Sequence, residues 1–171
     1  MINYLFFPQS QEPTVELQNI VECFKSQESV LDKLIPKDSN EVLNCVSKSL
    51  INNGYKVETD KKSKIKIPVL YGVNGKIEKS YDVDAISNDG KIVIEVEAGR
   101  AWANHQFLKD IFEVCLMPSV EYLVIAVFNY YASGKSNDFE RICTSLKAMY
   151  TSRFELPLKG ILLIGYGKAK P

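Results

Sequence analysis

Four carboxylates alternate along the chain on the two sides of a short turn. Asp82 and Asp84 precede the dipeptide Asp89-Gly90, and Glu95 and Glu97 follow it. An Asp-Gly pair between alternating apolar residues is a strong signal for a two-residue β-hairpin turn. With such a loop Asp84 faces Glu95 and Asp82 faces Glu97. Side chains alternate between the two faces of a strand, so we expect all four carboxylates on one face.

This arrangement calls for a positive charge. Like charges directly opposite each other destabilise a sheet by about 0.2–1 kcal/mol per pair, and no Lys or Arg is interleaved with these carboxylates along the two strands. A divalent cation would provide the charge, because Mg²⁺ in proteins takes one or two carboxylates together with water and phosphate. The alternative is a solvated acidic face. The spacing favours a Mg²⁺ site, which Mn²⁺ could also fill, held by Asp84 and Glu95.

The elements that must position these residues follow from the periodicity of the apolar positions. A three-to-four-residue period predicts helices over 14–34, 39–51, 102–117 and 138–150. A two-residue period or a continuous apolar run predicts strands over 55–59, 65–73, 77–87, 91–98, 121–130 and 160–166. This order predicts an α/β fold with a central mixed sheet flanked by helices. We expect one domain over 1–171, with an N-terminal helical segment at 1–37 and a core at 38–167.

The composition is that of a globular chain, with 46% hydrophobic and 25% charged residues. Twenty-one basic and 21 acidic residues cancel, whereas most proteins that bind nucleic acid are basic, so any such surface must be local. No apolar run is long enough to cross a membrane. The apolar start of the chain lacks the basic residues of a signal peptide. We expect a cytoplasmic protein.

The hairpin motif resembles a known signature. Asp84 followed by Glu95-Val96-Glu97 is similar to the PD-(D/E)XK motif of a large nuclease superfamily, whose acidic residues lie on adjacent strands before a helix. The resemblance covers about 39–167 and implies a restriction-endonuclease-like core. It also implies metal-assisted phosphodiester hydrolysis, in which Asp84 and Glu95 hold the ion.

Two positions depart from that signature. Val83 stands where the motif name has proline, and Glu97 stands where it has lysine. Some restriction endonucleases are similar in carrying Glu or Gln at the second position. Glu97 would then bind metal or position the attacking water, unless it marks an inactive relative. Lys109 on the following helix either returns the missing positive charge or is an ordinary solvated lysine.

The resemblance also points to an acidic residue on the first core helix. Glu41 would face the metal through water, as in many members. The same residue completes a capping box with Asp38. Both interpretations of Glu41 remain open.

Several residues are candidates for contacts with nucleic acid. Arg and Asn are natural readers of guanine and adenine, which singles out the start of the helix after the motif, and lysines bind phosphates. The alternative for the lysines is the charged protection of an edge strand. The candidates are Arg100, Asn104, Gln106, Lys61, Lys62 and Lys64.

The expected activity is that of a Mg²⁺-dependent endonuclease acting on double-stranded DNA, most similar to a type II restriction enzyme that works as a homodimer. A resolvase or repair nuclease on the same fold is one alternative. A catalytically inactive nuclease fold kept for DNA binding or assembly is the other.

Overall fold

A computed structural model describes residues 1–35, 39–58, 64–99, 101–131 and 136–168 of the chain. The elements in chain order are β1 (Asn3–Phe7), α1 (Val15–Ser26), α2 (Glu28–Leu31), α3 (Ser39–Asn52), β2 (Tyr55–Val57), β3 (Ile65–Tyr71), η1 (Val73–Gly75), β4 (Ile77–Val83), β5 (Ala85–Ser87), β6 (Ile92–Val96), η2 (Ala103–His105), α4 (Gln106–Cys115), β7 (Tyr122–Phe128), α5 (Asp138–Thr151) and β8 (Gly160–Tyr166).

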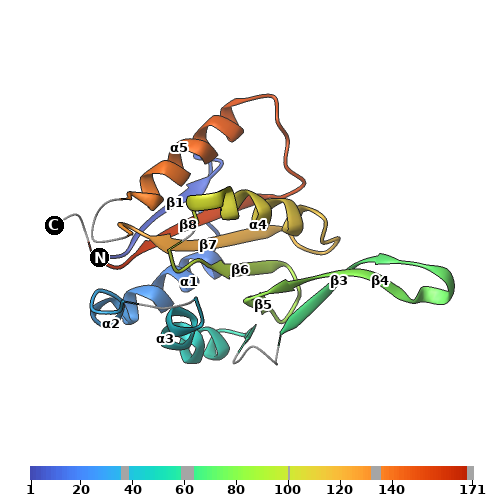
Figure 1. The fold of residues 1–171 in the computed structure, drawn as a ribbon, viewed down its shortest axis with the longest axis horizontal. Coiled ribbons are helices and arrows are strands. Elements are labelled where there is room, and N and C mark those ends of the chain that lie inside the picture. The colour runs from blue at the N-terminus through green and yellow to red at the C-terminus, as the bar shows by residue number, and fades with distance from the viewer. Residues whose placement is uncertain (36–38, 59–63, 100, 132–135, 169–171) are drawn as a thin grey trace.

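A six-stranded sheet forms the centre of the molecule, with strand order β1-β8-β7-β6-β5-β2. The β6–β7 and β7–β8 pairs are parallel, whereas β1–β8, β2–β5 and β5–β6 are antiparallel. Helices α1, α2 and α3 lie on one side of this sheet and α4 and α5 on the other (Figure 1). The predicted fold class, α/β with a central mixed sheet flanked by helices, is confirmed.

The central strands are apolar on both faces because each face is covered by helices. Alternate residues of β7 and β8 enter two separate cores: Val124 and Leu162 pack with α1 and α3, whereas Ile125 and Leu163 pack with α4 and α5. The same alternation along β6 turns Ile94 toward α3 and Val93 toward α4. Odd-numbered β6 positions therefore face α4.

Three predicted elements differ from the structure. Asn3–Phe7, inside the segment expected to be helical, forms the edge strand β1 against β8. The single strand predicted over 77–87 is divided at Asp84 into β4 and β5, which belong to different sheets. The helix predicted from 102 begins as α4 only at Gln106, because His105 has a left-handed backbone with φ 53°.

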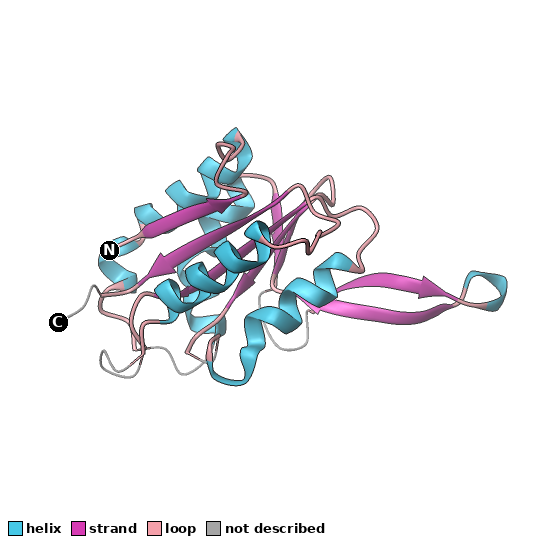
Figure 2. Ribbon diagram, turned by 90° about the horizontal axis from the view of Figure 1, so that it is seen from above, coloured by secondary structure: helices cyan, strands magenta, loops and turns pink. Residues whose placement is uncertain are grey.

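The strands β3 and β4 form a separate two-stranded arm that extends away from the body (Figures 1 and 2). Its turn lies at the predicted Asn74-Gly75 pair, where φ is 58° and 72°, respectively. Asn and Gly tolerate this left-handed backbone better than other residues. Apolar side chains near the tip are exposed, among them Leu70, Val73 and Ile77.

The helix starts follow their capping residues. The Thr14 side chain accepts a hydrogen bond from Leu17 N at the start of α1, and the Asn137 side chain accepts one from Glu140 N at the start of α5. Within the described parts of the chain, none of the helices combines the length and apolar character needed to cross a membrane.

Truncation of a buried residue in the second core tests this packing. Leu163 is fully buried between the sheet and the helices α4 and α5, so we expect Leu163→Ala to lower the free energy of unfolding by about 2–5 kcal/mol. Leu70→Ala makes the same truncation at a position that is 52% exposed and should cost under about 1 kcal/mol. Urea unfolding measures both, and equal losses would contradict the assignment of the core.

Candidate active site

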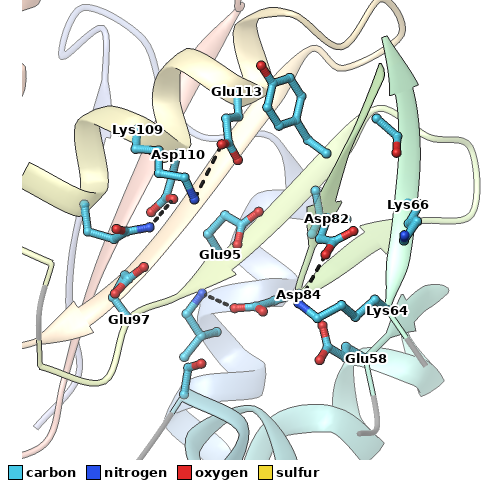
Figure 3. A pocket seen from close by; sticks show the side chains of 16 residues that line it. Glu58, Lys64, Lys66, Asp82, Asp84, Glu95, Glu97, Lys109, Asp110 and Glu113 are labelled. Atoms are coloured by element: carbon cyan, nitrogen blue, oxygen red, sulfur yellow. Dashed lines mark hydrogen bonds and ion pairs between the residues drawn. The ribbon is translucent and has the colours of Figure 1, made fainter. Parts of the chain in front are cut away.

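A polar cavity of about 490 Å³ opens where the arm leaves the six-stranded sheet. The arm, β6 and α4 all contribute side chains to it (Figure 3). Among the described residues, seven acidic side chains and three lysines line the cavity. The acidic residues are Glu58, Asp82, Asp84, Glu95, Glu97, Asp110 and Glu113, and the lysines are Lys64, Lys66 and Lys109.

Asp84 stands at the junction between the arm and the sheet. Its backbone carbonyl accepts a hydrogen bond from Glu58 N at 2.8 Å, which continues the pairing of β2 with β5. Its side-chain Oδ2 accepts one from Val96 N, also at 2.8 Å. The carboxylate thus satisfies a backbone N–H of β6 directly before β5 begins, and this bond orients it toward the cavity.

Glu95 and Glu97 enter the cavity from β6 on the face that is turned toward α4. The observed pairs Ala85–Ile94 and Ile86–Val93 have the register predicted from the two-residue Asp89-Gly90 loop. That register brings Asp84, Glu95 and Glu97 to one cavity, as predicted.

Asp82 is the exception to the predicted hairpin. It lies opposite Lys66 on the arm rather than opposite Glu97, because the chain leaves the central sheet at Asp84. Its Oδ2 pairs with Lys64 Nζ at 3.2 Å. A lysine therefore does pair with one of the four carboxylates, but this lysine directly precedes β3 and does not belong to the hairpin strands.

Helix α4 contributes a polar stripe that the sequence analysis largely missed. Gln106, Lys109, Asp110 and Glu113 line the cavity, and their spacing of three to four residues places them on one helical face. Lys109 Nζ pairs with Glu113 Oε1 at 3.5 Å. Of these residues only Gln106 and Lys109 were predicted. The periodic signal for Asp110 and Glu113 was present, but it matches the solvated face of an ordinary amphipathic helix.

Asp110 is 6% exposed, and its two oxygens are in different situations. Oδ1 accepts a hydrogen bond from Gln106 Nε2 at 3.3 Å. Oδ2 is buried and has no donor among the described residues. Glu97 lies within hydrogen-bonding reach of Asp110, and because burial raises the pKa of Glu97 to about 8, its protonated form is a potential donor to Asp110.

Burial and mutual repulsion raise the pKa of the cavity carboxyls. Burial raises the pKa of Asp84 from 3.8 to about 6, against the opposing effect of the Val96 hydrogen bond. Burial, followed by the charges of Asp84 and Asp110, raises the pKa of Glu95 well above its ordinary value. Burial is also the largest cause of the raised pKa of Glu97 and of Asp110. Among the described residues, the lysines of the cavity therefore do not fully compensate its carboxyls.

The donor set fits a hard divalent cation. Most of the side-chain oxygens that line the cavity belong to carboxylates, the type that Mg²⁺ and Mn²⁺ prefer, and one buried oxygen of Asp110 has no partner among the described residues. No three His, Cys, Asp or Glu side chains of the described residues are gathered in ligating geometry as they stand. A bound ion would thus be held by one or two carboxylates, with water or phosphate completing its shell.

The remaining predicted site residues have different outcomes. Lys64 and Gln106 line the cavity, but Glu41 does not; its helix α3 contributes Ser39 instead. Glu58, which was not predicted, contributes a buried acidic side chain to the cavity. Arg100, Lys61 and Lys62 lie outside the described residues, as does the side chain of Asn104.

Comparisons with known proteins support the fold. The chain is similar to the solved structure of the restriction endonuclease BglII complexed with a DNA 16-mer, with a TM-score of 0.54 and 13% sequence identity. The match covers 99% of this chain and 77% of that one. No family model matches the chain, and no curated protein sequence matches it. The structural match establishes a restriction-endonuclease-like fold.

The raised pKa values predict how stability depends on pH without metal. A carboxyl with a raised pKa keeps its proton in the folded state while the unfolded chain loses it, so stability falls as pH rises through that interval. The value of about 6 for Asp84 alone corresponds to about 3 kcal/mol. The pKa of Glu95 is raised by burial in the same direction, so in EDTA Glu95→Gln should raise the free energy of unfolding at pH 8.

The same variant should differ little from wild type at pH 4.5, where both folded forms carry a neutral group. Glu22→Gln on the exposed face of α1, where Glu22 pairs with Lys25, should leave the pH dependence unchanged. Guanidinium unfolding at the two pH values measures these differences. A loss of stability in Glu95→Gln at pH 8 would mean that positive charge in the cavity already compensates the ionised Glu95 carboxylate in wild type.

Proposed function

We propose that this protein is a divalent-metal-dependent DNA endonuclease with a variant PD-(D/E)XK site. One observation carries the proposal: Asp84 and Glu95, from consecutive segments of one hairpin, enter a buried acidic cavity on a restriction-endonuclease-like fold. Perturbed carboxylates gathered in a cleft are what a metal-dependent hydrolase requires. Fold likeness by itself does not assign an activity, so the argument rests on the site.

In this site Asp84 and Glu95 would hold Mg²⁺ or Mn²⁺. When bound, the ion would polarise the phosphate and lower the pKa of a coordinated water. The Val96 N–H holds Asp84 in the required orientation through its 2.8 Å hydrogen bond. Glu97, in the position of the motif lysine, can bind the ion or accept a hydrogen bond from the attacking water. Lys109 brings an ammonium group to the same cavity.

The proposed substrate is double-stranded DNA that reaches the cavity along the arm. Lys66 lies on β3, and Lys64 directly precedes that strand. Both line the cavity, where they could contact phosphates. Lys76 and Lys79 extend this positive character toward the tip of the arm. The chain as a whole has a net charge of zero, but these lysines give the arm a local positive charge. A homodimer would place two such cavities on the two strands, as a type II restriction enzyme requires.

Cleavage of mixed plasmid and phage DNA with Mg²⁺ or Mn²⁺ tests the activity. We expect wild type to cut, and Asp84→Asn and Glu95→Gln to lose at least about 100-fold in rate, since each removes a ligand of the ion that stabilises the transition state. Glu22→Gln serves as the control and should retain full activity.

The products of that assay separate the alternatives. Discrete fragments would indicate a site-specific restriction enzyme. Diffuse nicking that both cavity variants abolish would indicate a nuclease of the resolvase or repair type. No cleavage, together with no metal binding by calorimetry, would favour an inactive fold kept for DNA binding or assembly.

The salt dependence of DNA binding tests the path along the arm. Each lysine that contacts a phosphate contributes about one unit to the slope of log K against log salt. Lys64→Ala and Lys66→Ala should each reduce that slope by about one in metal-free binding measured by fluorescence anisotropy. Lys159→Ala, far along the chain and paired with Glu121, should not change it. Unchanged slopes in all three would remove the arm from the DNA path.

A further inference from the structure

The residue that stands at the motif lysine position, Glu97, lies one residue beyond the end of β6. Strand β6 ends at Val96, and its register with β7 ends at the same residue. The Glu97 N–H still donates to Ala126 O at 2.8 Å. The chain then turns at Gly99, where φ is 109°. The strand pairing therefore fixes the N–H side of Glu97, while its carbonyl side lies beyond the ladder.

A buried tyrosine of β8 holds that carbonyl side. Tyr166 Oη donates a hydrogen bond to the Glu97 carbonyl oxygen at 2.7 Å. Strand β7 lies between β8 and β6 in the sheet, so the phenol ring extends past Phe128 of β7, with the two ring centroids 4.7 Å apart. The Tyr166 side chain is fully buried, and a buried tyrosine hydroxyl requires a partner. Its partner here is the backbone of a residue whose side chain enters the cavity (Figure 3).

Aromatic packing extends the same contact toward the turn. Phe128 also packs against Tyr131, with ring centroids 6.1 Å apart. The Tyr131 ring lies against Gly99, where an added Cβ would come within 2.1 Å of Tyr131 Cε2. The segment after β6 is thus held at Glu97 by a hydrogen bond and at Gly99 by an aromatic ring.

We propose that Tyr166 is a positioning residue for the reaction, which fixes the direction of the Glu97 carboxylate through the Glu97 backbone. The proposal deepens the proposed function and rests on it. The backbone has two freely rotating dihedral angles per residue, so hydrogen bonds on both sides of Glu97 restrict the direction in which its side chain leaves. Tyr166 is not among the residues that line the cavity, so it would act through Glu97 and not by contact with metal or DNA.

The hydroxyl is the part of Tyr166 that core packing does not explain. Its neighbours include the rings of Phe24 and Phe128, against which a phenylalanine would pack equally well. Misplacing a catalytic group by about 1 Å can cost about 100-fold in rate. Loss of one of several constraints should cost less, about 10-fold, which is the upper range for a single hydrogen bond.

Tyr166→Phe keeps the ring and removes the hydrogen bond. Single-turnover cleavage of DNA by the full chain with Mg²⁺ should become about 10-fold slower, while the protein concentration that gives the half-maximal rate should stay the same. Amide hydrogen exchange over 97–99, measured in EDTA without DNA, should become faster by a similar factor. In a Glu97→Gln background the same change should slow cleavage by no more than about 2-fold, because the carboxylate to be positioned is gone.

Tyr150→Phe is the matched control. The Tyr150 hydroxyl is also buried, but it has no hydrogen-bond partner among the described residues, and its ring stacks on Phe7 away from the cavity. We expect Tyr150→Phe to leave both the cleavage rate and the exchange over 97–99 unchanged.

The outcomes separate this role from the proposed function. An active wild type whose rate is unchanged by Tyr166→Phe would overturn the positioning role and leave the nuclease standing. A loss of equal size in the Glu97→Gln background would indicate a general structural effect and would overturn it as well. If wild type does not cut DNA, the nuclease and any role of Tyr166 in its reaction are both contradicted, and the exchange over 97–99 still shows whether the hydroxyl fixes Glu97.

Discussion

The central constraint on this structure is the burial of like charges on a strand that must also be part of an apolar core. Strand β6 places Val93 in the core beneath α4 and then, on the same face, brings Glu95 and Glu97 into the cavity. Neighbouring segments add Asp84 and Asp110, both with a raised pKa because of burial. Such a cluster costs folding free energy in the absence of a counter-charge. Such a cost is consistent with the proposed cation site.

The break at Asp84 follows from this constraint. A continuous strand over 77–87 would have satisfied the Val96 N–H through its backbone. Instead the Asp84 carboxylate accepts that hydrogen bond, and the residues that precede Asp84 belong to the arm. One residue thus ends the pairing with β6, orients a candidate metal ligand and releases β4 to pair with β3. The arm also places Lys64 and Lys66 at the rim of the same cavity.

The distribution of charge around the cavity is uneven. Its lysines come from the arm and from the exposed end of the α4 stripe, and Lys64 and Lys109 are already paired with Asp82 and Glu113. The deeper carboxylates, Glu95 and Asp110, have no ion pair among the described residues, although Gln106 donates a hydrogen bond to Asp110. A phosphate could therefore meet ammonium groups at the rim, while only a cation can serve the interior. This division is consistent with the proposed DNA binding by a chain whose net charge is zero.

The sequence by itself determined the hairpin register, the two-layered burial of the central strands and the gathering of Asp84, Glu95 and Glu97. These features depend on short-range rules: an Asp-Gly loop sets the pairing, and alternation sets the faces. It also placed Gln106 and Lys109 on the following helix. The Asn74-Gly75 turn was predictable for the same local reason.

Only the tertiary structure decided which distant residues complete the cavity. Glu58, Asp110 and Glu113 look like solvated acids in the sequence, whereas the family resemblance pointed to Glu41. A helical period shows which residues share a face of the helix, but it does not show what that face contacts. The partner of Asp82 was also decided in three dimensions, once β4 paired with β3 instead of β6. Strand pairing and helix docking are long-range choices that balance the whole core, so local patterns do not encode them.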